Sequence, residues 1–138
     1  MNNERLFNRI KVHEGFRNKV YKCTEGFDTI GFGFAIKDLE LDEDIAEQIL
    51  MDKLDKLTHR IQDKFPWLEM APDLVGEVLT EMAYQMGVSG VSKFKRTLKF
   101  MEHHNWTRAA EEMLDSKWHR QTPKRAEELS NTIRNLDG

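Results

Sequence analysis

The sequence predicts an α+β protein, with a small β-hairpin near its N-terminus and a larger helical region after it. Strand-forming side chains are concentrated in residues 18–34, where the turn signal Thr24-Glu25-Gly26 separates two short runs. Apolar residues recur at helical spacing on both sides of this segment, over residues 3–13 and again after residue 42. We therefore expect a single domain over residues 1–138, a length that accommodates one core or a core divided by a cleft.

The first half of the chain is expected to contain three elements. A helix over residues 3–13 places Phe7 and Ile10 on one face. The hairpin follows, and in its second half Gly31 and Gly33 alternate with aromatic residues, which indicates a bulge or a close backbone approach. Residues 42–64 carry one apolar stripe over more than twenty positions and predict a long connecting helix.

The second half is expected to be helical throughout. Pro72 suits the first turn of a helix that continues to Met86, and Gly87 supplies its C-terminal stop. Three shorter helical patterns follow, over residues 92–104, 107–115 and 123–135. The predicted lobes are a β-lobe of about residues 15–40, a helical lobe of residues 1–14 and 65–138, and the connecting helix 42–64.

Composition and charge exclude several classes of function. The formal net charge of −3 gives no general reason to expect nucleic-acid binding. Cys23 is the only cysteine, so no internal disulfide forms, and no apolar run approaches the ~18 residues of a transmembrane helix. The N-terminal segment has no apolar stretch typical of a secretory signal, and we expect a soluble protein that accumulates in the cytoplasm. His103, His104 and His119 lack metal-ligand spacing, so neither a metal nor a cofactor is expected.

Glu14, Cys23 and Thr29 form the most informative pattern in the chain. Glu14 lies between a helix and Gly15, where partial burial raises the pKa of a carboxyl group and suits it to act as a general acid. Cys23 offers a thiolate as nucleophile or base, and the hydroxyl of Thr29 can hold a water molecule. Hydrolysis of a glycosidic bond requires such an acid on one face and a nucleophile or water-activating group on the other. Spacing alone leaves a second interpretation open: a surface carboxylate, a packing cysteine and a strand-forming threonine.

Three segments of the sequence resemble one family. EGFRNKVYKCTEGFDTIGFGF is similar to the active-site stretch of the phage-type lysozymes, the endolysins of glycoside hydrolase family 24, with its Glu, eight residues, Asp or Cys, five residues, Thr. EMAYQMGVSGVSKF resembles the cleft-forming helix and turn of that family. AAEEMLDSKWHRQTPKRA resembles its C-terminal segment. These ordered matches span most of the chain and imply a lysozyme-like fold, with the active-site cleft between the two lobes.

The resemblance implies a role for each matching residue. Glu14 takes the place of the general acid, Cys23 that of the second catalytic group and Thr29 that of the water-positioning hydroxyl. Arg125 matches an arginine that pairs with the catalytic glutamate. The positions expected to contact substrate are Tyr84 and Gln85 on the cleft helix, together with Thr97 and Glu112.

Several positions depart from the pattern of the family. Cys23 stands where many members carry aspartate, and Phe34 where many carry histidine. The stretch 35–70 is shorter than in the longer relatives, which implies a reduced β-lobe. Many members are basic, whereas this chain is slightly acidic and has local basic clusters at Lys93–Lys99 and Lys117–Arg125. Either cluster could face polyanionic wall material, but we favour scattered, solvated side chains.

By this resemblance the chain is expected to be a muramidase that cleaves the β-1,4 bond between N-acetylmuramic acid and N-acetylglucosamine in peptidoglycan, causing bacterial lysis. The implied protein is a monomer in the cytoplasm of the infected host, and a separate pore-forming protein lets it reach the wall. Two alternatives remain: a lysozyme-like module that binds peptidoglycan with weak or no turnover, and a helical regulatory protein with a redox-sensitive Cys23.

Overall fold

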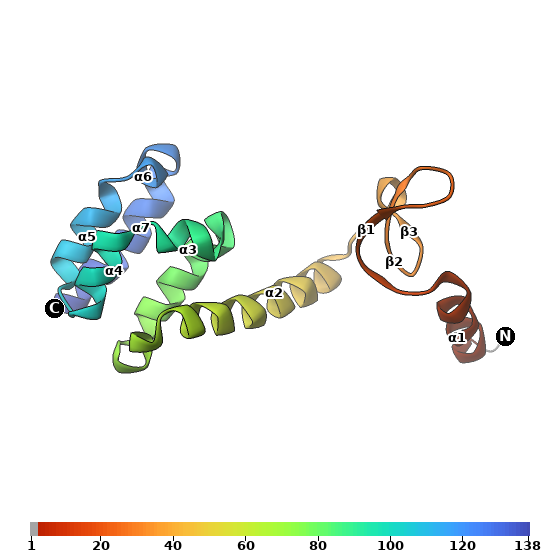
Figure 1. Ribbon diagram of the computed structural model, residues 1–138, viewed down its shortest axis with the longest axis horizontal. Coiled ribbons are helices and arrows are strands. Elements are labelled where there is room, and N and C mark those ends of the chain that lie inside the picture. Colours follow the sequence, from red (N-terminus) through yellow and green to blue (C-terminus); the bar gives the residue numbers. More distant parts are fainter. Residues whose placement is uncertain (1–2) are drawn as a thin grey trace. The chain divides into compact units, whose positions relative to one another are not determined.

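The computed structural model describes residues 3–138. These residues divide into two compact units, the first ending at Ala46 and the second running from Glu47 to Gly138 (Figure 1). The first unit contains the helix α1 (Asn3–Glu14) and the strands β1 (Arg17–Lys22), β2 (Asp28–Gly31) and β3 (Phe34–Ala35). The helix α2 (Glu43–Lys64) begins in the first unit and continues into the second. An α+β fold is therefore confirmed.

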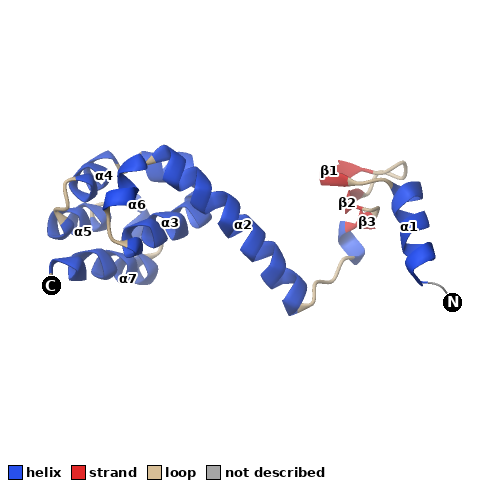
Figure 2. Ribbon diagram, turned by 90° about the horizontal axis from the view of Figure 1, so that it is seen from below, coloured by secondary structure: helices blue, strands red, loops and turns tan. Residues whose placement is uncertain are grey.

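The three strands form one antiparallel sheet in the order β1-β2-β3 (Figure 2). Tyr21 pairs with Thr29, and a bulge lies between Arg17 and Tyr21. The strand β3 was not expected from the sequence, which predicted a hairpin of two strands. It forms because Gly33 adopts a left-handed φ of 78°, which lets the chain reverse within three residues and pair Phe34 with Ile30.

The second unit is helical, as the periodicity predicted. Its remaining helices are α3 (Asp73–Ser92), α4 (Lys95–Glu102), α5 (Trp106–Leu114), α6 (Lys117–Gln121) and α7 (Pro123–Arg134). The stop predicted at Gly87 is confirmed as a kink, because Gly87 has a φ of 81° inside α3 and the helix resumes after it. The five-residue helix α6 was missed, since it is too short to show a helical period.

The hydrophobic core of the second unit is built by apolar residues from α2, α3, α4, α5, α6 and α7. Leu79, Met82 and Met101 are fully buried, and Trp106 and Trp118 are buried at its edges. The tryptophans were expected to pack rather than to bind sugar, and these two are core residues. This core gives the second unit a rigid frame for side chains far apart in the sequence.

No helix in residues 3–138 combines the length and apolar character needed to cross a bilayer. The first compact unit ends at Ala46, and the predicted membership of residues 1–14 in the helical lobe stays a prediction.

Candidate active site

The carboxylate of Glu14 lies at the C-terminal end of α1. The helix ends there because Gly15 adopts a left-handed φ of 68° and its N–H bonds to the carbonyl of Lys11 at 2.9 Å. The Glu14 side chain lies directly against the backbone of Gly33, so closely that a Cβ atom on residue 33 would collide with the carboxylate. Glycine at position 33 therefore serves both the left-handed turn and the close approach of Glu14.

The Glu14 side chain is exposed within the described structure, so its own unit does not supply the expected partial burial. Aromatic rings lie around the turn that contacts it. The ring centroids of Phe16 and Phe32 are 5.4 Å apart, and Phe34 meets Phe32 edge-on at 6.4 Å. At position 34, where many relatives have histidine, this chain therefore adds to an apolar cluster.

Cys23 and Thr29 are brought together by the turn between β1 and β2. The N–H of Cys23 donates to the carbonyl of Phe27 at 2.9 Å, which closes the turn, and Tyr21 pairs with Thr29 across the strands. The thiol is half-buried, whereas Thr29 is only 3% exposed. The turn between β1 and β2 therefore places the Cys23 thiol beside the Thr29 hydroxyl.

The surroundings of Cys23 favour its thiolate. Hydrogen bonds from the backbone N–H groups of Phe27 and Glu25 lower the pKa of the thiol, and the Thr29 hydroxyl adds to this effect. Partial desolvation and the negative charge of Glu25 oppose it, but the net direction is downward. A larger thiolate fraction at neutral pH suits a group that must act as a base or nucleophile.

The Thr29 hydroxyl has a single hydrogen for two acceptors. It donates to the Phe27 carbonyl at 2.9 Å, and it also interacts with the sulfur of Cys23. A deprotonated sulfur competes for that hydrogen more strongly, because hydrogen bonds to charged acceptors are the stronger ones. With the side chain this deeply buried, the structure favours an action of Thr29 through Cys23.

Replacing Thr29 with valine is expected to raise the pKa of Cys23, since one donor to the thiolate is lost while the two backbone donors remain. The rate of Cys23 alkylation by iodoacetamide, followed against pH, should reach its half-maximum at a higher pH in Thr29→Val than in the unmodified protein. Thr58→Val, in α2 of the other unit, serves as the control and should leave the profile in place. An unchanged profile in Thr29→Val would show that the hydroxyl does not hold the sulfur.

Three of the four residues expected to contact substrate line one cavity in the helical unit. Gln85, Thr97 and Glu112 come from α3, α4 and α5 and border a space of about 600 Å³. Thr97 is buried, and Glu112 forms an ion pair with Arg96 in which Oε1 and Nη2 are 3.1 Å apart. Residues separated by 27 positions in sequence therefore line the same cavity, and their contact with substrate stays a prediction.

A hydrogen-bond network that the sequence did not reveal orients Gln85. The indole N–H of Trp118 donates to Oε1 of Gln85 at 2.9 Å, and Nε2 of Gln85 donates to the hydroxyl of Thr122 at 3.4 Å. Thr122 in turn donates to the carbonyl of Trp118 at 3.0 Å. Because both ends of the Gln85 amide are engaged, its orientation is set, and Trp118 has a positioning role as well as a packing role.

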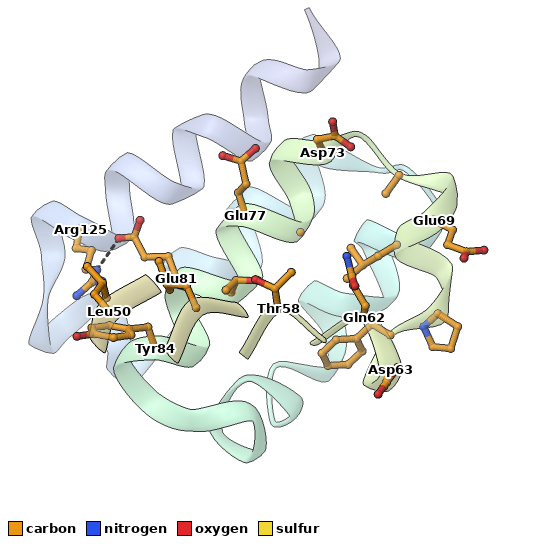
Figure 3. Close-up of a pocket in the computed structure, with 17 residues that line it drawn as sticks. Leu50, Thr58, Gln62, Asp63, Glu69, Asp73, Glu77, Glu81, Tyr84 and Arg125 are labelled. Atoms are coloured by element: carbon orange, nitrogen blue, oxygen red, sulfur yellow. Dashed lines mark hydrogen bonds and ion pairs between the residues drawn. The ribbon is translucent and has the colours of Figure 1, made fainter. Parts of the chain in front are cut away.

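Tyr84 and Arg125 lie together in a different, larger cavity of the same unit, about 1360 Å³ in volume, between α2 and α3 (Figure 3). Arg125 donates from Nε to Oε2 of Glu81 at 2.8 Å, the interaction drawn as a dashed line in Figure 3. The sequence had not suggested a role for Glu81. Glu81 precedes Gln85 by four residues, so the two side chains lie on the same face of α3. The pairing of Arg125 with Glu14 stays a prediction.

The described residues contain no group of three or more His, Cys, Asp and Glu side chains that could hold a metal ion.

Comparisons with known proteins identify the family of the chain. The family model described as phage lysozyme matches residues 11–134. Two proteins of Dictyostelium discoideum, named probable T4-type lysozyme 1 and 2, are 30% and 29% identical to the chain, with about 90% and 88% of both sequences covered. The pre-baseplate central spike protein Gp5 of Enterobacteria phage T4 is 30% identical over 90% of this chain, which spans 26% of that protein. The chain therefore belongs to the phage lysozyme family, whose members are glycoside hydrolases that act as muramidases on peptidoglycan.

Proposed function

We propose that this protein is a lytic muramidase in which Glu14 is the general acid and Cys23 is the second catalytic group. The observation that carries this proposal is the arrangement in the first unit, where a thiol with a lowered pKa lies beside the Thr29 hydroxyl on the sheet that also bears Gly33. The Glu14 carboxylate is packed against that same glycine. The first unit therefore carries an acid at the end of α1, a thiol in the turn between β1 and β2 and a hydroxyl on β2, which are the kinds of group that this reaction needs.

The bond to be cleaved is the β-1,4 linkage between N-acetylmuramic acid and N-acetylglucosamine. Glu14 donates its proton to the glycosidic oxygen as the bond to the anomeric carbon breaks. In the favoured route a water molecule attacks that carbon, and its proton passes to the Cys23 thiolate. In the other route the sulfur attacks the carbon directly, and water later releases the sugar. Thr29 supports the first route by holding the sulfur and limiting its freedom.

The biological role we propose is that of an endolysin. The protein would accumulate in the cytoplasm of an infected bacterium as a monomer and reach the wall through a pore made by a separate protein. The match to a phage spike protein and to two amoebal lysozymes shows that related chains occur in other settings. Lysis of the producing cell upon co-expression with a pore-forming protein, and survival without it, is the result expected of an endolysin.

The reaction itself is tested by digestion of purified peptidoglycan. New reducing ends on N-acetylmuramic acid, identified by mass spectrometry after borohydride reduction, are the expected product. Reducing ends on N-acetylglucosamine would assign a different glycosidase activity. Wall binding without release of any reducing sugar would favour the binding module, for which the unusual Cys23 and Phe34 are the motivating features.

The stereochemical outcome separates the two routes open to Cys23. In the water route the product has inverted configuration, both in the unmodified protein and in Cys23→Asp, because water attacks the anomeric carbon directly in each case. We expect Cys23→Asp to remain active within about one order of magnitude. NMR of the freshly formed anomer provides the measurement. Retention in the unmodified protein with inversion in Cys23→Asp would instead show that the sulfur attacks the sugar.

A further inference from the structure

Two neighbouring cavities lie along α2 and the second half of α3. They have volumes of about 460 and 450 Å³ and share Arg60 as a lining residue. We call the two cavities together the basic groove and define it by its polar and glycine lining residues. These are Lys53, Lys56, Arg60, Asp63 and Lys64 from α2, and Tyr84, Gly87, Ser89 and Ser92 from α3.

The cations of the basic groove share one side of α2. Lys53, Arg60 and Lys64 are spaced by seven and four residues, which brings them onto one face of a helix, and Lys56 lies one turn after Lys53. All four side chains are exposed. Asp63 is the only acidic residue among those that line these two cavities. The lining of the basic groove therefore carries four positive charges and one negative charge, in a chain whose net charge is −3.

The partners of these cations leave the positive character of the groove in place. The ammonium group of Lys53 lies 5.8 Å from the centroid of the Tyr84 ring, a contact that preserves its charge. Lys56 pairs with Asp52 at 2.9 Å, but this pair is exposed and such pairs contribute little. An incoming anion can therefore compete for it.

The other basic region is less suited to a polyanion. Lys93, Lys95, Arg96 and Lys117 border the cavity that contains Gln85, but Glu112 and Asp115 line the same space. Arg96 is already paired with Glu112. The lining of that cavity therefore holds two carboxylates beside its cations, whereas the lining of the two cavities along α2 holds one.

We propose that the basic groove binds a linear, phosphate-bearing polymer of the bacterial wall, of the polyol-phosphate type that is attached to peptidoglycan. The cations from Lys53 to Lys64 extend over about 16 Å of helix, a length suited to several successive phosphates. Arginine and lysine are the side chains that recognise phosphate. The choice of a wall polymer rests on the proposed function, because one end of the groove is Tyr84, where the glycan is expected to bind.

The test measures binding of the full chain to fluorescein-labelled poly(glycerol phosphate) by fluorescence anisotropy. Arg60→Gln/Lys64→Gln should bind roughly tenfold more weakly than the unmodified protein, and added salt should reduce that difference. The matched control is Lys99→Gln/Lys124→Gln, which removes the same charge from exposed lysines that line neither cavity of the groove. It should retain binding within about twofold.

Equal weakening by the two double variants would overturn the proposal, because it would show diffuse electrostatic attraction. Equal affinity of the unmodified protein for polyglutamate would also overturn it, since phosphate would then not be recognised. Turnover on peptidoglycan stripped of its phosphate polymers should be unchanged in the groove variant. Loss of turnover on the stripped peptidoglycan in this variant would assign Arg60 and Lys64 to the glycan site and contradict the inference. Polymer binding by a protein that hydrolyses nothing would refute the proposed function alone.

Discussion

Glu14→Gln is expected to reduce the lysis of purified cell walls by about 10²–10⁴-fold. Glutamine has the shape of the carboxylic acid but has no acidic proton, so the leaving sugar oxygen departs without protonation. We expect this substitution to leave the fold unchanged, because the Glu14 side chain is exposed and the end of α1 is set by the backbone of Gly15. The rate of turbidity loss of a peptidoglycan suspension provides the measurement.

Glu4→Gln is the matched control for this experiment, because Glu4 is exposed in the first turn of the same helix and makes the same change of charge. It should retain full activity. Circular dichroism of both variants should match that of the unmodified protein. Full activity of Glu14→Gln would end the assignment of Glu14 as the general acid and, with it, the proposed mechanism.

Gly33→Ala is expected to lower activity by about two orders of magnitude while leaving a folded protein. A Cβ atom built at this position lies 2.9 Å from Cδ of Glu14, so the carboxylate must move or the turn must open. A displacement of about 1 Å at a reacting group is enough to cause such a loss. The left-handed φ of 78° adds a separate cost of about 1 kcal/mol to the free energy of folding.

Gly26→Ala separates these two effects. Gly26 has a similar φ of 85°, but a Cβ atom there meets no heavy atom within 4 Å. Both variants should therefore lose comparable stability in thermal melts, and only Gly33→Ala should lose activity on cell walls. Equal activity of the two variants would show that Glu14 does not depend on the backbone at position 33.

Much of the fold followed from local patterns, because helix boundaries and turns depend on residues close in sequence. Gly15 ends α1 and Gly87 interrupts α3 through the backbone conformation that glycine alone adopts easily. The strand β3 escaped prediction, since two residues carry no period, and its pairing depends on a turn whose geometry only the structure reveals.

In the candidate site, too, some features followed from the local sequence and others depended on the structure. The Glu14, Cys23 and Thr29 pattern falls within sixteen residues, so one helix end and one hairpin suffice to place it. The role of Gly33 beside Glu14 and the two backbone donors to Cys23 depended on atomic positions, which no spacing rule supplies.

By itself, the sequence determined the α+β class and the main helices, and it singled out the residues proposed for the chemistry, because these depend on periodicity and on patterns within short segments. Only the tertiary structure decided which distant side chains meet. Arg125 pairs with Glu81 across 44 positions, and Trp118 orients Gln85 across 33. The basic groove likewise joins α2 to the second half of α3. Such contacts are set by how helices pack around a shared core, and packing depends on all the buried side chains at once.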